Sequence, residues 1–251
     1  MKEIFTETQT IVVPGNEEET IDVCVRHFIQ AANHAIKTNG FFAVALSGGS
    51  TPKAIFKKLS APENRDLIDY KKVFLFWSDE RDVLLDDPES NYKMAMDAGF
   101  SSLLVPKEQI FPMRASENES LEKNEALYET ILKNKLPNGR FDLVMLGMGD
   151  DGHTASLFPH TKALQIQNRL VVANEVPSKK SSRLTLTFKC INEAKEIVVY
   201  ILGKSKAEMV KTILKSPFDP EKFPIQGVVG TQTNRPLFIL DEAAASLILQ
   251  D

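Results

Sequence analysis

Short apolar runs alternate with helical patterns along most of this chain. The clearest runs lie at residues 41–47, 73–77, 141–147 and 196–202. Because they lack polar alternation, they predict strands that are covered on both faces. Helical patterns such as residues 51–59 separate them, which predicts βαβ units and a mostly parallel sheet. We therefore expect an α/β fold, built as a single doubly wound domain over residues 1–251 with helices flanking the central sheet.

Weaker signals complete the pattern. Residues 4–13 form a β-rich segment, and residues 184–188 alternate between apolar residues and threonine, as a strand does. No internal repeat and no flexible linker interrupts the sequence, so one domain is the simplest account. The chain is expected to close with a strand at residues 236–240 and a helix at residues 242–249.

The composition excludes several classes of protein. Of the 251 residues, 43% are hydrophobic and 25% are charged, which is typical of a globular chain with a substantial core. The formal net charge of −4 argues against a nucleic-acid-binding protein that relies on a basic surface. Cys24 and Cys190 are too few and too distant for a CxxC redox motif or a cysteine zinc site. Because no apolar run approaches the roughly 18 residues of a membrane span, and MKEIFTETQT lacks an apolar signal core, we expect a cytoplasmic protein.

A glycine-rich segment, SGGSTP at residues 47–52, follows the first apolar run. Gly48 and Gly49 allow the backbone to approach a ligand closely, and Ser50 or Thr51 can cap the next helix. Free N–H groups at such a corner can bind an anion, whereas the alternative is a plain strand–turn–helix connection. The spacing matches neither GxxxxGKS/T nor GxGxxG, so neither a nucleoside triphosphate nor a dinucleotide is favoured.

Charged residues stand beside other predicted strands. Asp79 and Arg81 follow the second run, where an arginine can bind a phosphate with two parallel hydrogen bonds and an aspartate can orient a hydroxyl or a histidine. Lys204 follows the fourth run, and Arg183 opens the alternating segment. Each cation alone is typical of a solvated surface. Because ligands of such folds bind beyond the carboxyl ends of strands, their combination indicates a cationic pocket.

The segment GMGDDGHTAS at residues 147–156 carries the most specific signal. His153 is expected at the start of a helix, whose positive end disfavours the imidazolium and keeps the ring neutral. A neutral histidine can act as a general base near pH 7, and Asp151 could hold the ring from two residues earlier. The alternative is a structural histidine. The sequence has no HExxH motif and no zinc-ligand spacing, so a metal hydrolase is not favoured.

At these segments the chain resembles the 6-phosphogluconolactonase family, a relative of glucosamine-6-phosphate deaminase. SGGSTP is shared with the wider superfamily, whereas DER together with DGHTASLFP is typical of the lactonase branch. The resemblance covers nearly the whole chain in order. Its motifs are SGGSTP at 47–52, DER at 79–81, GMGDDGHTASLFP at 147–159, RLTLTF at 183–188, GKSKAE at 203–208 and LDEAAASL at 240–247.

The resemblance implies an α/β enzyme that hydrolyses 6-phospho-D-glucono-1,5-lactone to 6-phosphogluconate in the pentose phosphate pathway, with no cofactor and no required metal. It implies His153 as the general base, with Asp79 lining the catalytic site beside the His153–Asp151 pair. Which cation meets the phosphate stays open. We expect a monomer whose partner is the small sugar-phosphate lactone. The implied substrate-contacting residues are Gly48, Gly49, Ser50, Thr51, Arg81, Arg183 and Lys204.

Two other functions compete with this interpretation. Deaminases that act on glucosamine 6-phosphate resemble the chain too, but they carry DEY where this sequence has DER, and their catalytic glutamate falls on Phe158. A phenyl ring cannot move a proton. A sugar-phosphate sensor without turnover is the second alternative, but it has no need of a base such as His153.

Overall fold

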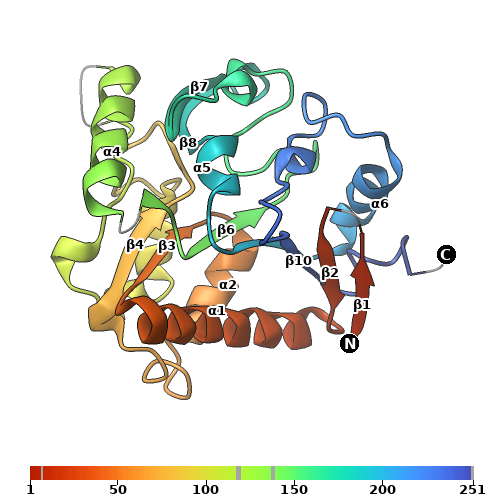
Figure 1. The fold of residues 1–251 in the computed structure, drawn as a ribbon, viewed down its shortest axis with the longest axis horizontal. Coiled ribbons are helices and arrows are strands. Elements are labelled where there is room, and N and C mark those ends of the chain that lie inside the picture. The colour runs from red at the N-terminus through yellow and green to blue at the C-terminus, as the bar shows by residue number, and fades with distance from the viewer. Residues whose placement is uncertain (7, 117–119, 137–138, 250–251) are drawn as a thin grey trace.

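Seven strands form the main sheet of the computed structural model, which describes residues 1–6, 8–116, 120–136 and 139–249. The strand order is β1-β2-β10-β9-β6-β3-β4, and every neighbouring pair is parallel except β1 and β2 (Figure 1). This confirms the predicted mostly parallel sheet. The strands are β1 (Lys2–Phe5), β2 (Thr10–Val13), β3 (Phe42–Leu46), β4 (Val73–Trp77), β6 (Leu143–Gly147), β9 (Ile197–Ile201) and β10 (Leu237–Leu240).

The central strands are apolar because helices and loops cover both of their faces. All five residues of β3 and all five of β9 are buried. Figure 1 shows α1 along one side of the main sheet, with α4, α5 and the strands β7 (Val171–Val176) and β8 (Ser181–Leu186) on the other. The helices are α1 (Glu17–Asn39), α2 (Ser50–Leu59), α3 (Asn91–Asp97), α4 (Leu121–Lys135), α5 (Phe188–Asn192) and α6 (Ala207–Lys215).

A second, antiparallel sheet of three strands lies beside the main one. Its order is β5 (Asp79–Arg81), β8 (Ser181–Leu186), β7 (Val171–Val176). The segment predicted as a strand at residues 184–188 therefore begins earlier than expected and ends at Leu186, because Phe188 already belongs to α5. Ser78 joins the two sheets: its N–H donates to the carbonyl of Leu46 over 2.8 Å, and its carbonyl accepts from the N–H of Leu186 over 2.8 Å.

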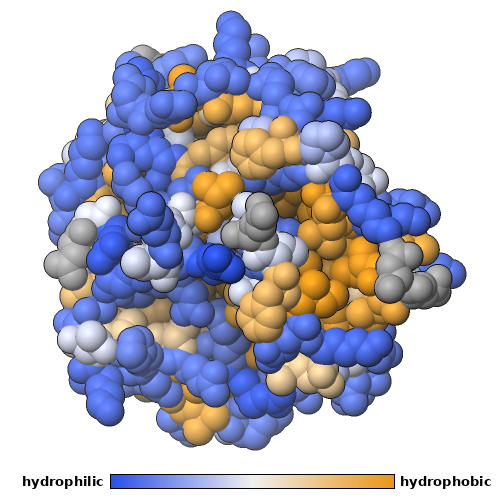
Figure 2. Space-filling model, turned by 45° about the vertical axis from the view of Figure 1, so that its right-hand side comes forward, coloured by the Kyte–Doolittle hydropathy of each residue, from blue (hydrophilic) through white to orange (hydrophobic). Residues whose placement is uncertain are grey.

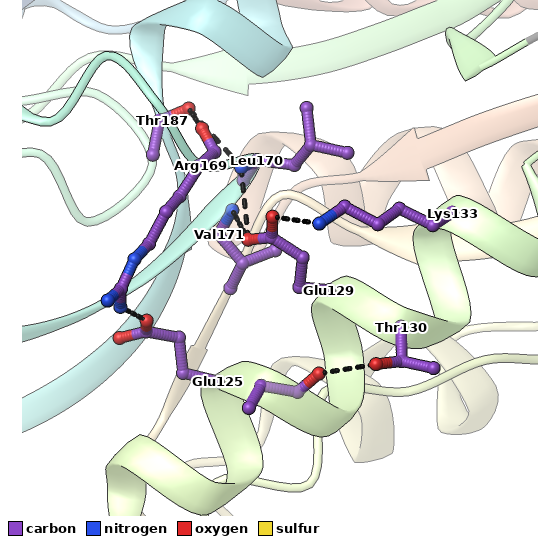
Figure 3. A network of polar contacts seen from close by, with 9 residues as sticks. Glu125, Glu129, Thr130, Lys133, Arg169, Leu170, Val171 and Thr187 are labelled. Carbon is purple, nitrogen blue, oxygen red and sulfur yellow. Dashed lines mark hydrogen bonds and ion pairs between the residues drawn. The ribbon is translucent and has the colours of Figure 1, made fainter.

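The outer edge of β7 is covered by helix α4 (Figure 3). Glu129 accepts hydrogen bonds from the backbone N–H groups of Leu170 and Val171, at 3.1 and 3.5 Å. Glu125 accepts from the N–H of Ala173 over 2.8 Å and from the guanidinium of Arg169. Because side-chain carboxylates satisfy this edge, the second sheet is fixed against the body of the protein.

Two terminal segments differ from their predicted form. Residues 4–13 contain two strands: β1 folds back on β2 as a hairpin, with Lys2 opposite Val13. Residues 242–249 form a series of turns instead of a helix. Their backbone hydrogen bonds have mixed spacing: three residues, as from Ser246 to Ala243, or four residues, as from Ala245 to Asp241. No regular helical ladder forms across these residues, because the spacing is not constant.

Figure 2, in which the side that carries α6 comes forward, shows hydrophilic side chains over most of this face and a hydrophobic area on its right. Large apolar side chains such as Phe5 and Phe218 are 68% and 64% exposed. Within the described ranges, no helix combines the length and the apolar character needed to cross a membrane.

Candidate active site

A cleft of about 610 Å³ opens at the carboxyl ends of the central strands. Strand β3 has β4 on one side and β6 on the other, so the chain changes direction across the sheet between β3 and β6. Ligands of open α/β sheets bind outside the carboxyl ends at such a point. The loops after β3 and β6 border the cleft here. Of the predicted site residues, the cleft is lined by Gly48, Gly49, Asp79, Arg81, Asp151, His153 and Arg183.

His153 and Asp151 form a close pair in the cleft. The Nδ1 atom of His153 lies 2.5 Å from Oδ1 of Asp151, and the same oxygen accepts from the backbone N–H of His153 over 3.1 Å. An imidazole that donates from Nδ1 to a carboxylate presents Nε2 as a hydrogen-bond acceptor. Burial raises the pKa of Asp151, but its hydrogen bonds to His153 and the charge of that ring outweigh this and lower the pKa to about 2. The carboxylate is therefore ionised at neutral pH.

The prediction that His153 begins a helix is wrong. Residues after His153 form turns and a short bridge between Thr154 and Leu157. The carbonyl of His153 accepts from the N–H of Gly149 over 2.8 Å, which folds the loop back on itself. Gly152 supports this course with a φ of 80°, a conformation that L-residues rarely adopt. A helix end therefore does not act on the imidazole.

The imidazole is positioned from three sides by its own loop. Asp151 holds Nδ1, and the ring of Phe158 stacks on the imidazole with 3.9 Å between centroids and 21° between planes. The backbone of Gly149 lies against the imidazole, because a Cβ at this position would overlap Nδ1 of His153. Phe158 is 4% exposed, so the stacked face of the imidazole is closed to water.

Arg81 and Arg183 lie opposite each other on two adjacent strands of the second sheet. Arg81 on β5 is the register partner of Arg183 on β8, and both line the cleft. Burial lowers the pKa of Arg183, and the neighbouring charge of Arg81 lowers it further. Like charges directly opposite each other on a sheet are unfavourable. An anion bound between the two guanidinium groups would relieve this repulsion and accept bidentate hydrogen bonds.

Asp79 lies deeper in the cleft and is 7% exposed. Its Oδ2 accepts from the hydroxyl of Ser156 over 2.6 Å, and its Oδ1 accepts from the amide of Asn91 over 3.3 Å. Its carboxylate is thus held in place by protein donors. A carboxylate held in this way can still accept a hydrogen bond from a substrate hydroxyl or a water molecule.

Three predicted contact residues lie at the edge of this arrangement. Ser50 and Thr51 open helix α2, while Lys204 opens a short 3₁₀ turn, Lys204–Lys206. Among the described residues that line the cleft, these three are absent. Lys206 lines it instead, with its Nζ 2.5 Å from Oδ1 of Asp150. Both lysines belong to GKSKAE, so the motif was the right signal, but only the turn determines which lysine faces inward.

Two further lining residues had no signal in the sequence analysis. Lys179 comes from the turn between β7 and β8, and Asn91 is the first residue of α3. Lys179 lies four residues before the RLTLTF motif and Asn91 ten residues after DER, so both fall just outside the recognised motifs. For metals, the described part of the chain contains no group of three or more His, Cys, Asp or Glu side chains placed to hold an ion.

The fold and this cleft define an α/β enzyme with a histidine–carboxylate pair and two neighbouring arginines in one cleft. Comparison with known proteins gives the family. The model of the glucosamine-6-phosphate isomerases/6-phosphogluconolactonase family matches residues 15–237. The chain belongs to this family.

Individual relatives agree with that assignment. A 6-phosphogluconolactonase of Chlamydia pneumoniae is 41% identical over 235 residues, which cover 93% of this chain and 88% of the relative. One from Haemophilus influenzae is 34% identical, covering 92% of this chain and 96% of the relative. The solved structure of 6-phosphogluconolactonase from Trypanosoma cruzi superposes with a TM-score of 0.82 at 27% identity, covering 98% of each chain.

Proposed function

We propose that this protein hydrolyses 6-phospho-D-glucono-1,5-lactone to 6-phosphogluconate, a step of the oxidative pentose phosphate pathway, with His153 as the general base. The observation that carries the proposal is the 2.5 Å contact between His153 and Asp151 in a cleft that also holds Arg81 and Arg183. Relatives named 6-phosphogluconolactonase at 41% and 34% identity support the substrate.

The chemistry follows from the pair. Nε2 of His153 takes a proton from a water molecule as its oxygen attacks C1 of the lactone. Asp151 holds the ring through Nδ1 and stabilises the imidazolium that forms. The tetrahedral intermediate collapses by breaking the bond between C1 and the ring oxygen, which receives the proton from His153. The products are a carboxylic acid, which ionises, and a free hydroxyl. A lactone is a reactive ester, so no covalent nucleophile is needed.

The phosphate supplies orientation. At pH 7 it carries a charge of about −1.5 to −2 and presents several acceptor oxygens. Arg81 and Arg183 offer paired guanidinium groups for it, and the backbone of Gly48 and Gly49 lines the same cleft. Binding energy from this remote group holds the lactone carbonyl near His153.

Phe158 argues against the deaminase alternative. It stacks on the imidazole at the position where the deaminases carry a catalytic glutamate, and it has no group that can transfer a proton. We propose a monomer as the working form. We also propose that the protein acts in the cytoplasm.

The test is acid release from 6-phosphogluconolactone by the purified protein, with the spontaneous reaction subtracted. Ammonia release from glucosamine 6-phosphate and hydrolysis of unphosphorylated gluconolactone are measured on the same preparation, with His153→Ala as control. We expect rapid hydrolysis of the phosphorylated lactone, much slower hydrolysis of the other, and no ammonia. Ammonia release at a comparable rate would overturn the proposal, and so would equal rates on the two lactones.

A further inference from the structure

Glu80 is a buried carboxylate for which the mechanism has no use. It is 0% exposed and lies between Asp79 and Arg81, which both line the cleft. Burial raises the pKa of Glu80, and the hydrogen bonds that it accepts oppose this rise. A carboxylate removed from water is retained only where partners satisfy both oxygens, so its surroundings indicate a task within the structure.

The partners of Glu80 come mainly from the start of helix α3. One oxygen accepts from the backbone N–H of Asn91 over 2.7 Å and from that of Arg81 over 2.8 Å. The other accepts from the hydroxyl of Ser90 and the N–H of Tyr92, each over 2.9 Å. Glu80 therefore ties the end of β5 to the start of α3 and closes the loop of residues 82–89 at its base.

This closure places the side chain of Asn91 in the floor of the cleft. Asn91 is 2% exposed, and its Nδ2 donates to the backbone carbonyl of Asp79 over 2.9 Å and to Oδ1 of Asp79 over 3.3 Å. The other side of the amide faces the glycine-rich loop. A Cβ on Gly48 would overlap Oδ1 and Cγ of Asn91, so the backbone of Gly48 lies directly against this amide.

We propose that Asn91 is a positioning residue that sets the Asp79 carboxylate and the Gly48 backbone relative to each other, and that Glu80 holds Asn91 in place. The inference rests on the proposed function, because the cleft so arranged is the lactone site. Asp79 follows β4 and Gly48 follows β3, and the side chain of Asn91 contacts both strand ends. Misplacement of an active-site group by about 1 Å can cost about 10²-fold in rate.

The test is a double-mutant cycle with Gly48→Ala and Asn91→Ala. Gly48→Ala alone pushes a methyl group into the amide and is expected to lower kcat by about 10²-fold. Asn91→Ala alone removes the amide donor from Oδ1 of Asp79, while Ser156 still holds Oδ2, and is expected to cost about as much. In the double variant the space left by Asn91 accepts the methyl group, so kcat should match that of Asn91→Ala. A loss near 10⁴-fold, the product of independent effects, would overturn the proposal.

Unfolding temperatures test the contact between Asn91 and Gly48 independently of any lactonase activity. Gly48→Ala should lower Tm by about 4–8 °C, and adding Asn91→Ala should restore part of that loss. A wild-type protein without lactone hydrolysis refutes the proposed function, whereas the Tm cycle still tests the contact. With an active wild type, an unchanged kcat in Asn91→Ala refutes the positioning role.

Glu80 is tested with its isosteric amide. Glu80→Gln places an N–H₂ group against N–H donors, so we expect kcat to fall by about 10-fold or more at temperatures well below Tm. The matched control is Asp86→Asn, which removes one negative charge from an exposed residue of the same loop and should leave kcat unchanged. Equal kcat in Glu80→Gln and Asp86→Asn would overturn the role of Glu80.

Discussion

Replacing Asp151 by asparagine separates the chemistry of the His153–Asp151 pair from its contribution to stability. Asparagine keeps the size of the side chain, but its N–H₂ group can donate to Nδ1 of His153. The proton of the imidazole then moves to Nε2, and the atom that faces the substrate is no longer a base. We therefore expect kcat to fall by about 10²–10⁴-fold, the usual value of general-base catalysis.

The effect on stability should be much smaller. Folding lowers the pKa of Asp151 from 3.8 to about 2. Such a shift corresponds to at most about 2.5 kcal/mol of preference for the ionised form. Because the side chain is 41% exposed, solvent screening reduces the contribution to about 1 kcal/mol. At neutral pH Asp151→Asn should thus lower Tm by only about 2–4 °C.

The direction of the pH dependence is fixed by the lowered pKa. A carboxylate whose pKa falls on folding stabilises the protein above its unfolded pKa and loses that contribution as the pH falls toward the folded value. The Tm difference between the wild type and Asp151→Asn should therefore be constant at neutral pH. It should shrink between about pH 4 and pH 2, provided that both proteins remain folded there.

The assay compares kcat on 6-phosphogluconolactone with Tm for three proteins: wild type, Asp151→Asn and Asp150→Asn. Asp150→Asn removes the same charge from the adjacent residue, whose carboxylate pairs with Lys206 and not with the imidazole. The ¹⁵N shifts of the His153 ring report the tautomer directly. Full kcat in Asp151→Asn would refute the reasoning, and so would an equal loss of kcat in Asp150→Asn.

Three further variants test other parts of the cleft. His153→Ala should fold normally and lose about 10²–10⁴-fold in kcat, and a folded variant with full kcat would refute the role of the base. Gly149→Ala should cost about 10²-fold in kcat, because its Cβ would overlap Nδ1 of His153, and unchanged kinetics would contradict the close approach seen here. Arg183→Ala should weaken the apparent affinity (raise KM) for the phosphorylated lactone by about 10–100-fold, since a hydrogen bond to a charged group contributes about 1.5–3 kcal/mol. KM for unphosphorylated gluconolactone should not change, and an equal rise for both lactones would show that Arg183 does not meet the phosphate.

The parallel core was predictable because its signal is local. An apolar run such as residues 42–46 can be satisfied only by cover on both faces, and helices on both sides of a parallel sheet provide it. Once the runs are assigned to strands, the residues at the carboxyl end of each strand follow directly from the sequence. For this reason the loops at Gly48, Asp79 and His153 could be assigned to one edge of the sheet before any contact was seen.

The terminal segments show where local signals were insufficient. The β-rich residues 4–13 give no sign of where the hairpin reverses, and β1 and β2 are defined by their pairing with each other. The closing segment at residues 242–249 has helical composition, yet Asp241 accepts from the N–H groups of Gly203 and Ala244 at 3.0 and 2.7 Å. The bond to Ala244 is local and has the form of a helix N-cap, whereas the bond to Gly203 is tertiary. The composition, which favoured a helix, gives no sign of the turns that form there.

By itself, the sequence determined the fold class, the parallel strands of the core, and the motifs from which the cleft is built. The tertiary structure alone decided that Arg81 opposes Arg183, that Lys206 and not Lys204 lines the cleft, and that a turn carries His153. It also decided that Asn91 lies between Asp79 and Gly48. The physical reason is range: periodicity and turn chemistry act between neighbours in the chain, whereas strand register and side-chain direction arise from packing between distant segments.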